Sequence, residues 1–163
     1  DSTYRKKAKI ALNEFNKWEG KISFNNFDWG DLPQEDIVTI DREIRVEDVY
    51  GCIKEVKEND IVVDIGASVG AFTYSILDNK PNKVYCIEPS KKALGCLLKN
   101  TFDKTLSYKN SPLVCINKAI GNPEDSINIF GSESEFEVST FSNIIEDYDI
   151  EKINYLKIDC EGG

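Results

Sequence analysis

The strongest hydrophobic pattern in the chain starts at Ile61. Residues 61–65 form a β-branched apolar run broken only by Asp64, and a stretch of small residues, 66–71, follows directly. Side chains suited to burial then recur about one helical turn apart: Val69, Phe72, Thr73, Ile76 and Leu77. This pattern predicts a buried strand, a tight turn and an amphipathic helix, the opening unit of a doubly wound α/β fold.

Similar apolar runs predict three more strands, over residues 83–87, 113–117 and 155–159. Helical spacing between them predicts helices over 90–104 and 141–148. Three leucines are expected to face the sheet from the first of these helices: Leu94, Leu97 and Leu98. The order of elements is typical of an α/β protein with a parallel sheet.

The remaining segments have weaker patterns. Residues 1–20 place their apolar side chains on one face and predict a helix with a basic start. Residues 21–34 are rich in aromatic side chains, which could anchor that helix, cover a cleft or form a contact between copies of the chain. A short strand is predicted over 37–40, a helix over 46–56, and an exposed strand over 126–130 followed by an acidic, Ser-rich loop.

The turn after the first predicted strand narrows the choice of ligand. The order Asp64-x-Gly66-x-Ser68-x-Gly70 lacks the glycine triplet of the dinucleotide fingerprint, and no Gly-Lys-Ser/Thr of a P-loop follows. An acid two residues before the first glycine suits a ligand with an ammonium group and no phosphate. S-adenosylmethionine (SAM) is such a ligand. The alternative is a plain turn and helix start in a protein with another ligand or none.

The second predicted strand also ends in a carboxylate, Glu88. An acid at the tip of this strand can accept both hydroxyl groups of a ribose. The alternative is that Glu88 caps the next helix, because Pro89 and Ser90 are good residues for a helix start. The two roles are compatible.

Two more carboxylates, Asp159 and Glu161, follow the last predicted strand at the same edge of the sheet. Methyl transfer is an in-line displacement, so the protein mainly has to orient the acceptor and, for a hydroxyl, remove a proton. We predict catalytic roles for both residues. Clustered acids could instead hold a divalent metal. Otherwise Asp159 would contact the amine of SAM and Glu161 would support the turn.

Four motifs in this order resemble the FkbM family of SAM-dependent methyltransferases. They are Asp64-Ile-Gly-Ala-Ser-Val-Gly-Ala-Phe-Thr, Ile87-Glu-Pro-Ser, Asn117-Lys-Ala-Ile-Gly and Leu156-Lys-Ile-Asp-Cys-Glu-Gly-Gly. Ser68 stands where many members carry Asn. The resemblance implies a Rossmann-like class I methyltransferase sheet, of which only the first four strands are visible.

The resemblance also implies a cofactor site, an acceptor class and a domain boundary. SAM would contact the turn, the end of the second strand and the exit of the third: Asp64, Gly66, Ala67, Ser68, Gly70, Phe72, Thr73, Glu88, Pro89, Ser90, Lys118 and Ala119. The expected reaction is O-methylation of a hydroxyl on a sugar or secondary metabolite. The chain would comprise an N-terminal extension, 1–44, and the front half of the SAM-binding domain, 45–163, truncated after the Asp-x-Glu-Gly motif.

Composition and net charge limit the classes of molecule that the chain is expected to bind. The 163 residues are 40% hydrophobic, which fits one domain with a core, and the net charge of −9 argues against nucleic-acid backbones and anionic membranes. We therefore expect a small-molecule acceptor, no nucleic acid and no membrane, with a homo-oligomer left open. Five scattered cysteines and no secretion signal indicate a reduced cytoplasm. The chain has no histidine, and no metal ligands are predicted.

Two other functions stay open. One is a nucleotide-linked oxidoreductase on the same fold, against which the missing glycine triplet counts. The other is a binding or scaffold module that keeps the fold without turnover.

Overall fold

The computed structural model describes residues 23–52, 54–124 and 136–160. Several predictions lie outside the described residues: the helix over 1–20, the strand over 126–130 with most of the loop that follows it, and the role of Glu161.

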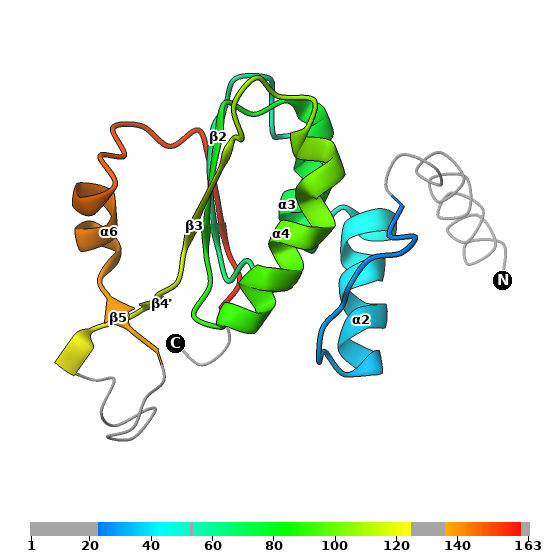
Figure 1. The fold of residues 1–163 in the computed structure, drawn as a ribbon, viewed down its shortest axis with the longest axis horizontal. Helices are drawn as coiled ribbons and strands as arrows, with labels where there is room; N and C mark the ends of the chain where they lie inside the picture. Colours follow the sequence, from blue (N-terminus) through cyan, green and yellow to red (C-terminus); the bar gives the residue numbers. More distant parts are fainter. Residues whose placement is uncertain (1–22, 53, 125–135, 161–163) are drawn as a thin grey trace, which may run out of the picture.

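The described residues form a four-stranded parallel sheet (Figure 1). Its strands are β1 (Ile61–Ile65), β2 (Lys83–Ile87), β3 (Leu113–Ile116) and β6 (Tyr155–Ile158), in the spatial order β3-β2-β1-β6. The predicted α/β class and the four predicted strands are confirmed, although β3 and β6 each end one residue early. A separate parallel pair, β4 (Ala119–Ile120) and β5 (Val138–Ser139), follows the exit of β3.

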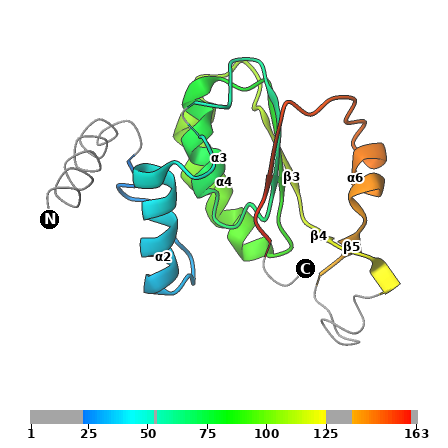
Figure 2. The same ribbon diagram turned by 180° about the vertical axis from the view of Figure 1, so that it is seen from behind.

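Helices cover both faces of the sheet (Figures 1 and 2). One face carries α3 (Ala71–Ile76), extended by a 3₁₀ turn, η2 (Leu77–Asn79), and α4 (Lys91–Thr105). The other face carries α6 (Phe141–Asp147). The helices predicted at these places are confirmed.

One of the three leucines of α4 does not face the sheet. Leu94 and Leu97 are buried, but Leu98 is 52% exposed, so the prediction for Leu98 is wrong. One residue along a helix rotates the side chain by about 100°, and this step carries Leu98 away from the sheet.

Alternation along the strands divides the core into two layers. Side chains of one parity pack against α3 and α4: Val62, Val84 and Cys86. Side chains of the other parity pack in the layer that contains α6: Val63, Ile65, Tyr85 and Ile87. Strands buried on both faces have nearly continuous apolar sequences, which is why β1 and β2 were recognisable in the sequence. Asp64 has the parity of Val62, so its carboxylate lies on the side of α3.

Helix α2 (Gln34–Asp41) occupies the place of the strand predicted over 37–40, and that prediction is wrong. Ile37, Ile40 and Ile44 recur at helical spacing, and Ile44 is fully buried in the core beneath α3. A run of four apolar or β-branched residues is too short to distinguish a strand from a helix. The contact made by Ile44 favours the helix.

The helix predicted over 46–56 is also wrong. Helix α2 continues into a π-helical turn, η1 (Arg42–Glu47), and the chain leaves it at Asp48, which has a left-handed φ of 47°. Gly51 also has a positive φ, 60°, and the chain around it forms turns. The apolar spacing reflects burial of side chains such as Cys52 from a turn rather than a helix.

No helix within the described ranges is long and apolar enough to cross a membrane.

Candidate functional site

The order of the strands creates a topological switch point between β1 and β6. From β1 the chain moves to β2 and β3 on one side, and it returns to β6 on the other side of β1. Ligands of open α/β sheets bind outside the carboxyl ends of the strands at such a point. The ends of β1, β2 and β6 are in register, so Gly66, Glu88 and Asp159 leave three neighbouring strands at one level. This edge is the candidate site.

Two glycines shape the turn that follows β1. Gly66 has a φ of 74°, and a Cβ there would lie 1.9 Å from the carbonyl oxygen of Asp159. Gly70 has a φ of 87°, and a Cβ there would lie 2.6 Å from Cγ of Leu97 in α4. Only glycine fits either position. Ser68, between them, also has a positive φ of 49°, a conformation that Asn adopts more readily than most residues.

The backbone amides of this turn are hydrogen-bonded within the chain. Those of Gly66 and Ala67 donate to the last carbonyl of β2 at 3.0 and 3.1 Å, and that of Gly70 donates to the Ala67 carbonyl at 2.9 Å. The Ser68 amide donates to Oε2 of Glu88 at 3.0 Å. A pyrophosphate at such a turn requires amide donors that point at the ligand. These four amides therefore do not form a pyrophosphate site.

Glu88 links the end of β2 to the turn and to α4. Its Oε1 accepts the amide of Ser90 at 2.9 Å. Ser90 is the N-cap of α4 and its hydroxyl accepts an amide of the first turn at 3.2 Å, so Ser90 performs the capping considered for Glu88. Asn117 donates to the carbonyls of Glu88 and Pro89 at 3.0 and 2.6 Å. Each carboxylate oxygen can accept a further bond, so Glu88 retains the capacity to bind hydroxyl groups.

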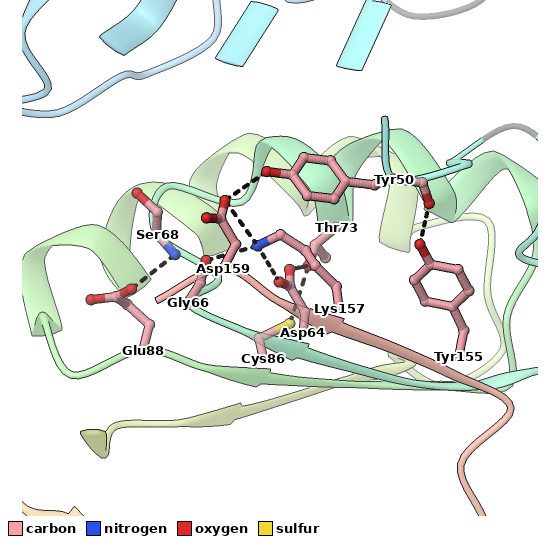
Figure 3. Close-up of polar contacts among 10 residues, drawn as sticks. All are labelled: Tyr50, Asp64, Gly66, Ser68, Thr73, Cys86, Glu88, Tyr155, Lys157 and Asp159. Atoms are coloured by element: carbon pink, nitrogen blue, oxygen red, sulfur yellow. Dashed lines mark hydrogen bonds and ion pairs between the residues drawn. The ribbon is translucent and has the colours of Figure 1, made fainter. Parts of the chain in front are cut away.

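Asp64 is fully buried, and its charge is balanced within the protein (Figure 3). Its Oδ1 lies 2.9 Å from Nζ of Lys157, whose side chain is 5% exposed. Its Oδ2 accepts the hydroxyl of Thr73 at 2.7 Å. The ammonium group that Asp64 binds in this structure thus comes from the chain itself, and contact with the ammonium of a ligand stays a prediction.

Sequence reasoning did not identify Lys157 as a site residue. Its ammonium donates to Asp64 and, at 3.0 Å, to the carbonyl of Gly66, and it lies 3.9 Å from Oδ2 of Asp159. The available signal was a lysine in the middle of an apolar run predicted to be a strand, because a lysine that is buried there needs a carboxylate partner. Lys157 connects the two sides of the switch point.

Asp159 lies at a small cavity beside Lys157 and is about half exposed. Its Oδ2 accepts the hydroxyl of Tyr50 at 2.7 Å (Figure 3). Burial, and then the hydrogen bond to Asp159, raise the pKa of Tyr50 above its usual value, so this hydroxyl stays protonated at neutral pH. The cavity has a volume of about 40 Å³ and is lined by both residues, the turn and η1. Tyr50 was also missed, because no site motif includes it.

A larger pocket lies beside Glu88. Its volume is about 280 Å³, and its walls come from the N-terminal segment, the glycine turn and the start of α4. The lining residues are Gly30, Asp31, Leu32, Ser68, Val69, Glu88, Ser90, Lys92, Ala93 and Cys96. Three of them were predicted as cofactor contacts, and the three N-terminal residues were not.

The other predicted contacts lie outside this pocket. Phe72 packs between two tyrosine rings, with centroid distances of 5.9 and 5.7 Å. The ammonium of Lys118 pairs with Glu137 at 2.8 Å and lies 3.8 Å from Asp147 of α6. Ala119 begins β4. The cofactor contacts of these residues stay predictions.

Over residues 23–52, 54–124 and 136–160, no group of three or more His, Cys, Asp or Glu side chains is placed to hold a metal ion. All five cysteines are free thiols, and Cys52, Cys86 and Cys96 are buried.

No family model and no curated protein matches the sequence. Among solved structures, the chain is similar to a suggested rRNA methylase from Clostridium thermocellum, with 24% identity over 45% of this chain and 39% of that chain and a TM-score of 0.39. It is similar to an rRNA methylase from Streptococcus thermophilus, with 16% identity over 68% and 80% of the two chains and a TM-score of 0.39.

A third similar structure is a phosphoethanolamine N-methyltransferase from Haemonchus contortus in complex with phosphoethanolamine and S-adenosylhomocysteine. The identity is 17% over 71% of this chain and 21% of that chain, with a TM-score of 0.38. The chain therefore spans only 39% and 21% of the length of the Clostridium and Haemonchus proteins. Similarities at this level establish neither a family nor an activity for this chain.

Proposed function

We propose that this chain belongs to a SAM-dependent methyltransferase of the FkbM type that methylates a hydroxyl oxygen of a small acceptor, such as a sugar or secondary metabolite. The observation that carries the proposal is the glycine turn at the switch point between β1 and β6, with the carboxylate of Glu88 beside it. The position of the turn supports a ligand site, and its chemistry supports the choice of ligand.

The groups at this edge have the chemistry that SAM requires. Glu88 presents carboxylate oxygens at a pocket of about 280 Å³, which suits the two hydroxyls of a ribose. Asp159, about half exposed beyond the turn, suits an ammonium group or an acceptor hydroxyl. The internal hydrogen bonds of the four turn amides disfavour a dinucleotide and hence the oxidoreductase alternative.

Bound SAM would supply a methyl group that its sulfonium already activates. The chain would then have to orient the acceptor and receive its proton. Asp159 is our candidate for orienting the acceptor, because its carboxylate is itself held in position. The Tyr50 hydroxyl donates a hydrogen bond to its Oδ2, and the Lys157 ammonium lies 3.9 Å from the same oxygen. Glu161, outside the described residues, is the second proposed catalytic carboxylate.

Calorimetric titration of the full-length protein with S-adenosylhomocysteine, beside NADH, tests the cofactor. We expect binding of S-adenosylhomocysteine and none of NADH. Glu88→Ala should weaken binding by roughly 10- to 100-fold, because it removes hydrogen bonds to a charged group worth about 1.5–3 kcal/mol. Glu58→Ala is the matched control, since this residue precedes β1 at the opposite edge of the sheet. Binding of NADH without binding of S-adenosylhomocysteine would refute the proposal.

Turnover requires a separate assay. Transfer of labelled methyl from SAM to a panel of hydroxyl compounds, with RNA included, tests the acceptor class. The net charge of −9 favours a small acceptor over RNA. Methylation of RNA alone would contradict the acceptor proposal, and cofactor binding without any transfer would favour the scaffold alternative.

A further inference from the structure

We propose that the N-terminal segment 28–32 is a clamp that closes the nucleoside half of the cofactor pocket and contacts the adenosine part of the ligand. This inference rests on the proposed function. The segment precedes the region that resembles methyltransferases, roughly residues 45–163, so no motif of that region assigns it a role.

The pocket beside Glu88 has the segment as one of its walls. Residues 30–32 line it together with residues of the glycine turn and the start of α4. Because Glu88 lines this pocket, a ribose held by its carboxylate lies within reach of the segment. The apolar side chains of Leu32, Val69 and Ala93 also line the pocket, which suits the flat face of a purine.

One side chain of α4, Asn100, ties the segment to the glycine turn. Its Oδ1 accepts the amide of Asp28 at 2.7 Å, and its Nδ2 donates to the carbonyl of Asp28 at 2.9 Å. The same Nδ2 donates to the carbonyl of Val69 at 2.9 Å. Since Val69 belongs to the turn, Asn100 fixes two walls of the pocket relative to each other.

Aromatic packing holds the segment from its N-terminal side. The rings of Phe27 and Trp29 lie 4.7 Å apart, and Phe27 packs edge-on against Tyr74 of α3 at 5.4 Å. Gly30 then has a φ of 60°, and a Cβ there would lie 3.3 Å from Sγ of Cys96 in α4. The backbone of the segment is thus packed closely against α4 before it reaches the pocket.

Two ion pairs contribute less to this arrangement. Asp28 pairs with Lys99 at 2.8 Å, and Asp31 pairs with Lys92. Both lysines and Asp31 are well exposed, and exposed pairs add little to stability. The hydrogen bonds of Asn100 and the aromatic contacts therefore position the segment.

Titration with two ligands tests the clamp. S-adenosylhomocysteine is the whole ligand, and methylthioadenosine represents its nucleoside half. In the full-length protein, Leu32→Ala and Asn100→Ala should each weaken the binding of both ligands by the same factor, about fivefold to twentyfold. The first variant removes, and the second loosens, a wall that contacts the adenosine. Val38→Ala is the control, since Val38 is exposed on α2 outside this pocket and should leave both affinities unchanged.

Fluorescence gives a second readout that a purely structural role would not change. The chain has two tryptophans, Trp18 and Trp29, so Trp18→Phe leaves Trp29 as the reporter next to Gly30. Binding of methylthioadenosine should shift the emission of Trp29.

The outcomes separate the clamp from the proposed function. Normal binding of both ligands by Leu32→Ala and Asn100→Ala would overturn the clamp and leave the proposed function intact. Weakened binding of S-adenosylhomocysteine with unchanged binding of methylthioadenosine would also overturn the clamp, because the segment would then act on the amino-acid half of the ligand. Failure of the wild-type protein to bind S-adenosylhomocysteine would refute the proposed function and the clamp together.

Discussion

Removal of Lys157 alone should severely destabilise the protein. Lys157→Met keeps the length of the side chain but removes the ammonium that neutralises Asp64, which is 0% exposed, and that donates to the carbonyl of Gly66. Breaking a buried ion pair by removing one partner costs about 3–5 kcal/mol. Domains have a total stability of about 5–15 kcal/mol, so this loss is about a fifth of the total or more. For a chain of this size, the expected fall in Tm is about 6–20 °C.

A double-mutant cycle distinguishes the ion pair from a general packing effect. Asp64→Asn keeps an acceptor for Thr73 and should also destabilise the protein, because it leaves the buried ammonium unpaired. The double variant Asp64→Asn/Lys157→Met should lose less stability than the sum of the losses of the two single variants, because neither buried charge remains. The difference, the coupling energy, should be about 2 kcal/mol.

Urea unfolding followed by circular dichroism measures the four free energies of the cycle. Lys92→Met, which breaks an exposed pair with Asp31, is the control and should cost less than about 1 kcal/mol. A loss below about 1 kcal/mol for Lys157→Met, or a cycle without coupling, would refute the reasoning.

Two further predictions follow from the turn and from the core. Gly66→Ala should destabilise the protein by more than about 3 kcal/mol, because the added Cβ would collide with the Asp159 carbonyl. Gly95→Ala is the control in α4, where a Cβ meets nothing within 4 Å, and it should stabilise the protein by about 0.5–1 kcal/mol. Equal Tm values for the two variants in thermal scans would contradict the turn geometry. Burial raises the pKa of Cys52 from 9.0 to about 12, so between these pH values the folded protein retains a proton that the unfolded chain releases. This thiol should therefore lower the free energy of unfolding by about 1.4 kcal/mol for each pH unit between about pH 9 and 12. Urea unfolding at several alkaline pH values should give a flatter profile for Cys52→Ala than for the wild type, and identical profiles would show that the thiol is not protected.

The sequence by itself determined the central sheet and its glycine turn. Strands buried on both faces are almost continuously apolar, as β1 and β2 are, and the four apolar runs of the sheet were recognisable without any neighbour. The turn was also recognisable, because Gly66 and Gly70 meet backbone requirements that no other residue satisfies. Parallel strands bring their carboxyl ends to one edge, so Glu88 and Asp159 were correctly expected at the same level.

Only the tertiary structure decided the elements whose patterns are short. Residues 37–40 are compatible with a strand, but burial of Ile44 against the core selects a helix for this part of the chain. The apolar positions of 46–56 fit a helix, yet the left-handed residue Asp48 ends η1, and the turns that follow bury Cys52 and Val56 but leave Val49 exposed. Periodicity reports which side chains are buried, and a short segment can bury the same side chains in more than one conformation.

The tertiary structure also decided which residues surround the site. The partner of Asp64 is Lys157, 93 positions away, and residues 30–32 line the same pocket as Glu88. Such contacts depend on the order of strands in the sheet and on the path of the N-terminal segment, neither of which leaves a local periodic signal. Sequence patterns specify the conformation of each element through its own burial, whereas the site is formed by charges and walls that only the packing of distant elements brings together.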